Sequence, residues 1–151
     1  MKTKIEITRN EIPIQDTIKE FSNHSVGAIV SFLGTTRSTF TDESGVTKQV
    51  QYLSYEGYEP MAIKVMSDIA KEAKAQYTDL DGVAIIHRLG IVGLAQESIL
   101  VVTASPHRKD AIDAVGWIMD KVKKLVPIWK LEVYTDGSTW KENKEWRDRN
   151  L

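Results

Sequence analysis

Two apolar runs rich in β-branched residues follow each other directly in the middle of the chain. "GVAIIHRLGIV" covers residues 82–92 and "SILVVTAS" covers residues 98–105, with only "GLAQE" between them. Runs of this length and composition predict buried strands. Because these strands follow one another without a helix between them, the chain is not a regular alternation of strands and helices. This favours an α+β protein with a mixed, largely antiparallel sheet.

Periodicity along the rest of the chain completes the predicted order, β-α-β-β-α-β-β-α-β, within a single domain of residues 1–151. A doubly wound sheet is the weaker alternative. We expect residues 38–48 to form a mobile hairpin loop and the polar tail after about residue 137 to be mobile. The other predicted strands cover residues 4–12, 26–34, 49–58 and 128–134, and the predicted helices cover residues 14–24, 60–77 and 106–125.

Charge and cysteine content exclude several classes of function. The formal net charge of −1 argues against general binding to nucleic acid or to anionic membranes. No apolar run approaches the ~20 residues of a membrane span and the N-terminus lacks a signal-peptide core, so we expect a soluble, cytoplasmic protein. With no cysteine, the chain has no thiolate nucleophile and no internal persulfide carrier. The histidines (His24, His87 and His107) lack metal-ligand spacing, so we expect no metal.

The last predicted helix places a charged pair in its first turn. Ser105 and Pro106 are typical of a helix cap and first helical position, and His107 and Arg108 follow them. On a helical wheel Arg108 falls near the middle of the apolar stripe, where a cation needs an anionic partner. The helix N-terminus favours anions, so this turn is a candidate anion site. The alternative is that Arg108 pairs with an acid at the helix end.

The loop "GTTR", residues 34–37, is a second candidate anion site. Its glycine allows close approach of a ligand, Thr35 and Thr36 supply hydroxyls, and Arg37 can bind a phosphate bidentately. An ordinary surface arginine after a strand is the alternative. In "HRLG", His87 and Arg88 face opposite sides of a strand, so at most one of them points at any given site.

Two lysines flank the corner in "KKLVPIWKLE". Pro127 ends the helix, so Lys123 and Lys130 lie on two elements that meet at a turn. Two amines in a partly apolar setting disfavour each other's charge, and such a lysine can act as a base, a nucleophile or an oxyanion stabiliser. The alternative is two lysines whose stems are buried and whose amines lie in water.

Arg108 and Lys123 are fifteen positions apart on this helix, which corresponds to about 22 Å. A small ligand cannot contact both residues within one chain. Either there are two sites, or the chain dimerises so that the helix start of one copy meets the helix end of the other.

Five segments together resemble the family of large, catalytic subunits of molybdopterin synthase: "GAIVSFLGTTR", "YLSYEGYEPMA", "IIHRLGIV", "SPHRKDA" and "KKLVPIWKLE". The resemblance implies an α/β hammerhead-like core with an additional antiparallel β sub-domain. It implies conversion of cyclic pyranopterin monophosphate (precursor Z) to molybdopterin in molybdenum cofactor biosynthesis, without a cofactor. It also implies a small ubiquitin-like partner subunit, whose C-terminal Gly-Gly thiocarboxylate supplies the sulfur, and a heterotetramer around a homodimer of the large subunit.

The resemblance also assigns roles to residues. The family's essential lysine falls on Lys123 and its second lysine on Lys130. The substrate-binding positions fall on Thr35, Thr36, Arg37, His107, Arg108, Leu131 and Glu132, with the His-Arg pair acting across the dimer. Many relatives have a basic residue in place of Leu131, which argues against a role for its side chain. The positions of Thr35 and Thr36 vary among relatives, which indicates mainly backbone contacts at these two residues.

Two hypotheses follow, an enzyme and a non-catalytic dimeric module that binds a phosphorylated pterin or nucleotide. The enzyme needs Lys123 and Lys130 to converge on one cavity, whereas the binding module makes no use of them.

Overall fold

The computed structural model describes residues 1–142 and arranges them as nine strands and three helices. In chain order these are β1 (Lys2–Thr8), α1 (Ile14–Glu20), β2 (Ala28–Thr35), β3 (Thr39–Thr41), β4 (Thr47–Gly57), α2 (Glu59–Gln76), β5 (Gly82–Arg88), β6 (Gly90–Gly93), β7 (Glu97–Ser105), α3 (Arg108–Leu125), β8 (Ile128–Tyr134) and β9 (Thr139–Lys141). No helix of this part of the chain is long and apolar enough to cross a membrane.

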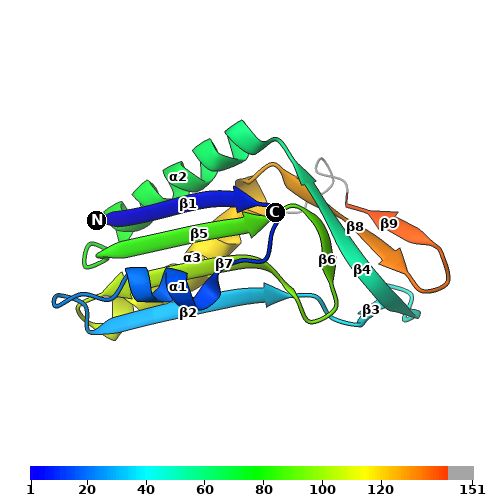
Figure 1. Ribbon diagram of the computed structural model, residues 1–151, viewed down its shortest axis with the longest axis horizontal. Helices are drawn as coiled ribbons and strands as arrows, with labels where there is room; N and C mark the ends of the chain where they lie inside the picture. The colour runs from blue at the N-terminus through cyan, green and yellow to red at the C-terminus, as the bar shows by residue number, and fades with distance from the viewer. Residues whose placement is uncertain (143–151) are drawn as a thin grey trace.

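The first sheet has the strand order β1-β5-β7-β2 and carries helices on both faces (Figure 1). β1 pairs with β5 in parallel, while β7 pairs antiparallel with β5 and with β2. Side chains of β5 alternate between the two faces, as in any strand. Val83 and Ile85 belong to the core with α2 and α3, and Ala84 and Ile86 belong to the core with α1. Both faces of the sheet are therefore buried, which explains the nearly continuous apolar run of β5.

The second sheet is entirely antiparallel and lies across one end of the first (Figure 1). β4 is its longest strand and pairs with β3, β6 and β8, and β9 extends the sheet beyond β8. A small core of Val50, Leu53 and Tyr134 lies on this sheet, with Phe40 and Tyr55 packed against it.

The two sheets are joined at the turn between α3 and β8. Val126, Pro127 and Ile128 are all buried there, and the backbone N–H of Tyr58 donates to the Pro127 carbonyl at 3.2 Å. Gly57 makes this contact possible, because a Cβ at that position would lie 2.8 Å from the Ile128 side chain and 3.0 Å from the Pro127 carbonyl oxygen. The end of β4 is thus packed directly against the turn that follows α3.

The expected α+β class and the separate antiparallel sub-domain are confirmed, and the doubly wound alternative is wrong. The run at residues 82–92 is two strands, not one. It breaks at Gly90, whose φ of +84° favours glycine, so β5 and β6 join different sheets.

Three further differences concern element boundaries. Residues 38–48, expected to be a loop, contain β3, and β9 lies at the start of the expected polar tail. The rest of that tail, residues 143–151, lies outside the described residues. α3 begins at Arg108 with His107 as its cap residue, so the predicted Ser105 cap is wrong. Ser105 is instead the last residue of β7, and its hydroxyl donates to the carbonyl of His107.

Gly82 provides a test of the packing between β5 and α1. A Cβ at Gly82 would lie 2.4 Å from the ring of the buried Phe21, so Gly82→Ala should lower the free energy of unfolding by about 1–3 kcal/mol. Denaturant titration measures this change. In a Phe21→Leu background the same substitution should lower the free energy of unfolding by less, because the smaller leucine side chain removes the clash. Equal costs in both backgrounds would contradict this packing.

Candidate functional site

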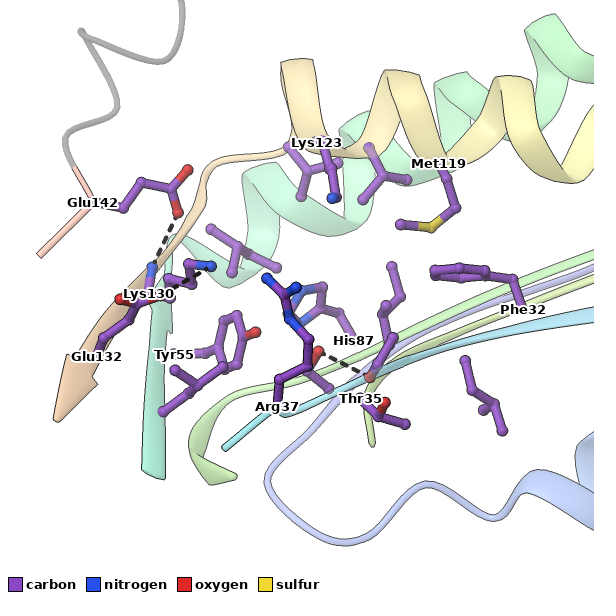
Figure 2. Close-up of a pocket in the computed structure, with 18 of the residues that line it drawn as sticks. Phe32, Thr35, Arg37, Tyr55, His87, Met119, Lys123, Lys130, Glu132 and Glu142 are labelled. Carbon is purple, nitrogen blue, oxygen red and sulfur yellow. Dashed lines mark hydrogen bonds and ion pairs between the residues drawn. The ribbon is translucent and has the colours of Figure 1, made fainter. Parts of the chain in front are cut away.

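A cavity of about 600 Å³ opens where the first sheet, the end of α3 and the second sheet meet (Figure 2). Its lining comes from β2, β3 and the loop between them, from β4, β5 and β7, from α3 and the turn that follows it, from β8, and from Glu142. The polar and charged lining residues are Thr35, Arg37, Thr39, Tyr55, His87, Ser98, Lys123, Lys130, Glu132 and Glu142. The apolar residues include Phe32, Val50, Leu53, Met119, Val122 and Ile128.

Lys123 and Lys130 line this same cavity. Lys123 extends from the last turn of α3 and Lys130 from β8, so the two lysines lie on either side of the turn at Pro127 (Figure 2). The structure therefore provides the convergence that the enzyme hypothesis requires.

Lys130 is held by a buried acid. Its ammonium lies 3.4 Å from Glu132 Oε1, and Glu132 is only 4% exposed. The hydroxyl of Tyr134 donates to the other carboxylate oxygen, Oε2, at 2.5 Å. Burial, and then this hydrogen bond to Glu132, raise the pKa of Tyr134, which therefore remains a donor at neutral pH. Glu132 thus orients Lys130 within the cavity, through a contact that the sequence did not predict.

Glu142 adds a second acid beside Lys130. Its carboxylate accepts from the backbone N–H of Lys130 at 3.4 Å, and its own N–H donates to the Lys130 carbonyl at 2.9 Å. The end of the described chain is thereby fixed along the rim of the cavity.

The "GTTR" loop contributes two of its predicted residues. Thr35 and Arg37 line the cavity, and Arg37 extends across it towards the lysines (Figure 2). Thr36 does not, because its side chain is buried and its backbone is paired on both sides. The backbone N–H of Thr36 donates to the backbone carbonyl of Gln96 at 3.1 Å, and the Thr36 carbonyl accepts from the backbone N–H of Ala95 at 2.9 Å. These two bonds hold the loop in place, so Thr36 is a structural residue of the site.

Three predicted site residues lie elsewhere within the single chain. His107 and Arg108 are exposed at the opposite end of α3, and neither lines the cavity. Leu131 pairs with Ser54 and Lys141 within the second sheet and does not line the cavity either.

The predicted position of Arg108 within an apolar stripe is wrong. The buried face of α3 consists of Ala111, Ala114, Ile118 and Val122, whereas Ile112 is 51% exposed. The two alanines allow the helix to approach the sheet closely, which turns the bulkier Ile112, and Arg108 one turn before it, towards solvent.

Sequence reasoning considered His87 together with Arg88 but did not assign it to the site. It is 7% exposed, lines the cavity, and lies with its ring edge against Tyr55 at a centroid distance of 5.2 Å. Burial lowers its pKa to about 4, so the imidazole is neutral at pH 7. Alternation along β5 was the available signal, because it puts His87 on the same face as Val83 and Ile85.

Comparison with known proteins identifies the family. The family described as MoaE protein matches residues 7–125. The chain therefore belongs to the MoaE protein family.

The curated relatives in this family are molybdopterin synthase catalytic subunits. The relative from Dictyostelium discoideum is 45% identical and that from Culex quinquefasciatus 40% identical, each over 144 residues that cover 93% of this chain and 88% of the relative. Among solved structures, molybdopterin synthase from Staphylococcus aureus superposes with a TM-score of 0.82 at 31% identity, covering 91% of this chain and 96% of the other. The expected enzyme of molybdopterin synthesis, with a role in molybdenum cofactor biosynthesis, is confirmed.

The buried neutral histidine predicts a specific pH dependence of stability. His87 has a pKa of about 4 when folded and near 6.5 when unfolded, so the unfolded state binds its proton first as the pH falls. The stability is complete above about pH 6.5 and decreases as the pH drops towards 4. Relative to pH 8, this one group should remove about 2 kcal/mol from the free energy of unfolding at pH 5.

Comparison of wild type with His87→Gln isolates this contribution, because all other titrating groups are shared. Denaturant titrations at pH 8 and pH 5 should show a smaller loss for the variant, by about 2 kcal/mol. Identical losses in both proteins would mean that His87 is not buried as a neutral ring.

Proposed function

We propose that the chain is the catalytic subunit of a sulfurtransferase that converts cyclic pyranopterin monophosphate to molybdopterin. The observation that supports this most strongly is the convergence of Lys123, Lys130 and Arg37 on one cavity. Cationic donors in a partly closed cavity suit a substrate that carries a cyclic phosphate. The chain has no cysteine, so the sulfur must come from another molecule.

The sulfur donor is the C-terminal thiocarboxylate of a small ubiquitin-like subunit. The solved structure from Helicobacter pylori is described as a complex of subunits 1 and 2 of molybdopterin-converting factor, and one of its chains has the same fold as this chain, with a TM-score of 0.69 at 21% identity. An extended peptide end could enter the cavity past Lys123, which lies exposed at its rim.

The two lysines have different surroundings, which supports different roles. Lys123 has no acidic partner within ion-pair distance among residues 1–142, so its ammonium is available to the reacting thiocarboxylate or to the oxyanion that forms there. Lys130 is fixed by Glu132 and suits the positioning of the substrate or of a covalent intermediate.

A homodimer completes the site with His107 and Arg108. α3 spans Arg108–Leu125, so its two ends cannot contact one small ligand within a single chain. Phe32 on the edge strand β2 is 38% exposed, and Ile112 on α3 is also exposed. Exposed apolar side chains, and the edge that β2 forms among the described strands of the first sheet, both favour association of two copies. In that dimer Arg108 of one copy binds the phosphate in the cavity of the other.

The lysine assignment is tested by Lys123→Ala. Loss of the ammonium should reduce formation of molybdopterin by at least about 100-fold, because one preorganised charge at the reacting group is lost. The assay combines purified protein, cyclic pyranopterin monophosphate and thiocarboxylated small subunit, and detects the dithiolene product. Lys124→Ala is the matched control, since Lys124 does not line the cavity, and it should stay near wild-type activity. Retained turnover in Lys123→Ala would refute the assignment.

The composite site is tested with mixed dimers of one Arg108→Ala chain and one Lys123→Ala chain. One cavity of such a dimer combines Lys123 of the first chain with Arg108 of the second and is intact, while the other lacks both groups. Purified mixed dimers should therefore show about half the wild-type activity, although each variant homodimer is nearly inactive. Activity no higher than that of the homodimers would mean that Lys123 and Arg108 do not complete one site across the dimer.

A non-catalytic module that binds a phosphorylated pterin is the second candidate. It would bind the substrate through Arg37 and Arg108 and give no dithiolene product with the thiocarboxylated subunit, so the same assay separates it from the enzyme.

A further inference from the structure

We propose that His87 is a substrate-binding residue, which accepts a hydrogen bond from a ring N–H of the pterin through its Nε2 atom. This inference rests on the proposed function and adds a residue that determines which heterocycle the cavity accepts.

The backbone around His87 fixes the position of its ring. His87 lies near the end of β5, where it pairs with Ile7 of β1 on one side and with Ile99 of β7 on the other. Its side chain follows those of Val83 and Ile85 along the face that α2 and α3 cover. At His87 this face reaches the cavity, and Figure 2 shows the ring beside Tyr55 and behind Arg37.

The hydrogen bond at the other ring nitrogen determines the tautomer. Nδ1 lies 2.8 Å from the backbone carbonyl oxygen of Arg88, and a carbonyl oxygen can only accept. Nδ1 therefore carries the proton, and in the neutral ring Nε2 has a free lone pair. Among residues 1–142 the bond to Arg88 is the only hydrogen bond that the ring makes.

The surroundings keep the ring neutral. His87 is buried, which lowers its pKa to about 4, and Arg37 and Lys123 bring positive charge to the same cavity. No carboxylate lies within hydrogen-bonding distance of the imidazole in the described part of the chain. The nearest ring contact, with Tyr55, is edge-on and holds the orientation without neutralising a charge.

His87 adds a neutral acceptor with a fixed orientation beside the cationic side chains of the cavity. Arg37, Lys123 and Lys130 can only donate, and the carboxylate of Glu132 is already bound by Lys130 and Tyr134. The cationic donors alone do not distinguish one small phosphate from another. An oriented lone pair on a neutral ring selects in addition for a ligand that presents an N–H donor beside its anionic group, as a reduced pterin does.

Two variants separate the role of Nε2 from that of Nδ1. In His87→Asn the side-chain amide can still donate to the Arg88 carbonyl but has no atom near the position of Nε2. In His87→Gln the longer side chain can place its amide oxygen close to that position. Direct titration of each full-length protein with cyclic pyranopterin monophosphate gives the dissociation constants.

We expect the dissociation constant to rise by about 10-fold or more in His87→Asn and by less than about 3-fold in His87→Gln. A purely structural role in holding the Arg88 carbonyl gives the reverse order, and that result would overturn the proposal. Wild type that neither binds nor converts this substrate would overturn the proposed function itself. Wild type that does both, with His87→Asn binding equally well, would overturn only the role of His87.

A measurement on the unaltered protein covers the case in which a variant does not fold. With ¹⁵N-labelled histidine, the Nε2 resonance of His87 in the free protein should be that of an unprotonated nitrogen. Addition of cyclic pyranopterin monophosphate should shift this resonance in the direction of an accepted hydrogen bond. An unchanged resonance at saturating ligand would contradict the proposal.

Discussion

The packing of the Val126–Pro127–Ile128 turn against the end of β4 determines the geometry of the site. These three residues are buried, and the N–H of Tyr58 binds the Pro127 carbonyl across a gap that only a glycine at position 57 leaves open. The turn fixes where α3 ends and where β8 begins. Because Lys123 lies in the last turn of the helix and Lys130 is the third residue of the strand, this packing places both side chains on one cavity.

Burial, as well as the number of lysines, determines which side chains of the cavity carry a charge and where. The carboxylate of Glu132 is buried beneath Lys130 and is held from the other side by the Tyr134 hydroxyl. A buried carboxylate is costly without such partners, so the pair and its hydrogen bond form one unit. His87, by contrast, is buried without an acid and stays neutral. The cavity thus combines a fixed cation at Lys130, exposed cations at Lys123 and Arg37, and a neutral acceptor at His87.

The sequence predicted the elements better than their connections. Apolar periodicity located the strands and helices that form the core, and the corner at Pro127 located the two lysines. Apolar periodicity could not show that residues 82–92 divide between two sheets. Gly90 interrupts the apolar run only slightly, but its positive φ redirects the chain into the second sheet. The face of α3 was misplaced because two alanines, which contribute little to an apolar stripe, decide how closely the helix packs. The sequence could not decide between His87 and Arg88, because the role of a strand histidine depends on where the covering helices end, which is a property of the tertiary structure.

The most direct measurement of the central claim, that one cavity holds both lysines and the substrate, is a crystal structure of the protein with cyclic pyranopterin monophosphate bound. The account predicts that the pterin lies among Lys123, Lys130 and His87 of one copy, with its phosphate beside Arg108 of a second copy. Substrate bound away from this cavity, or bound with both lysines directed into solvent, would contradict it.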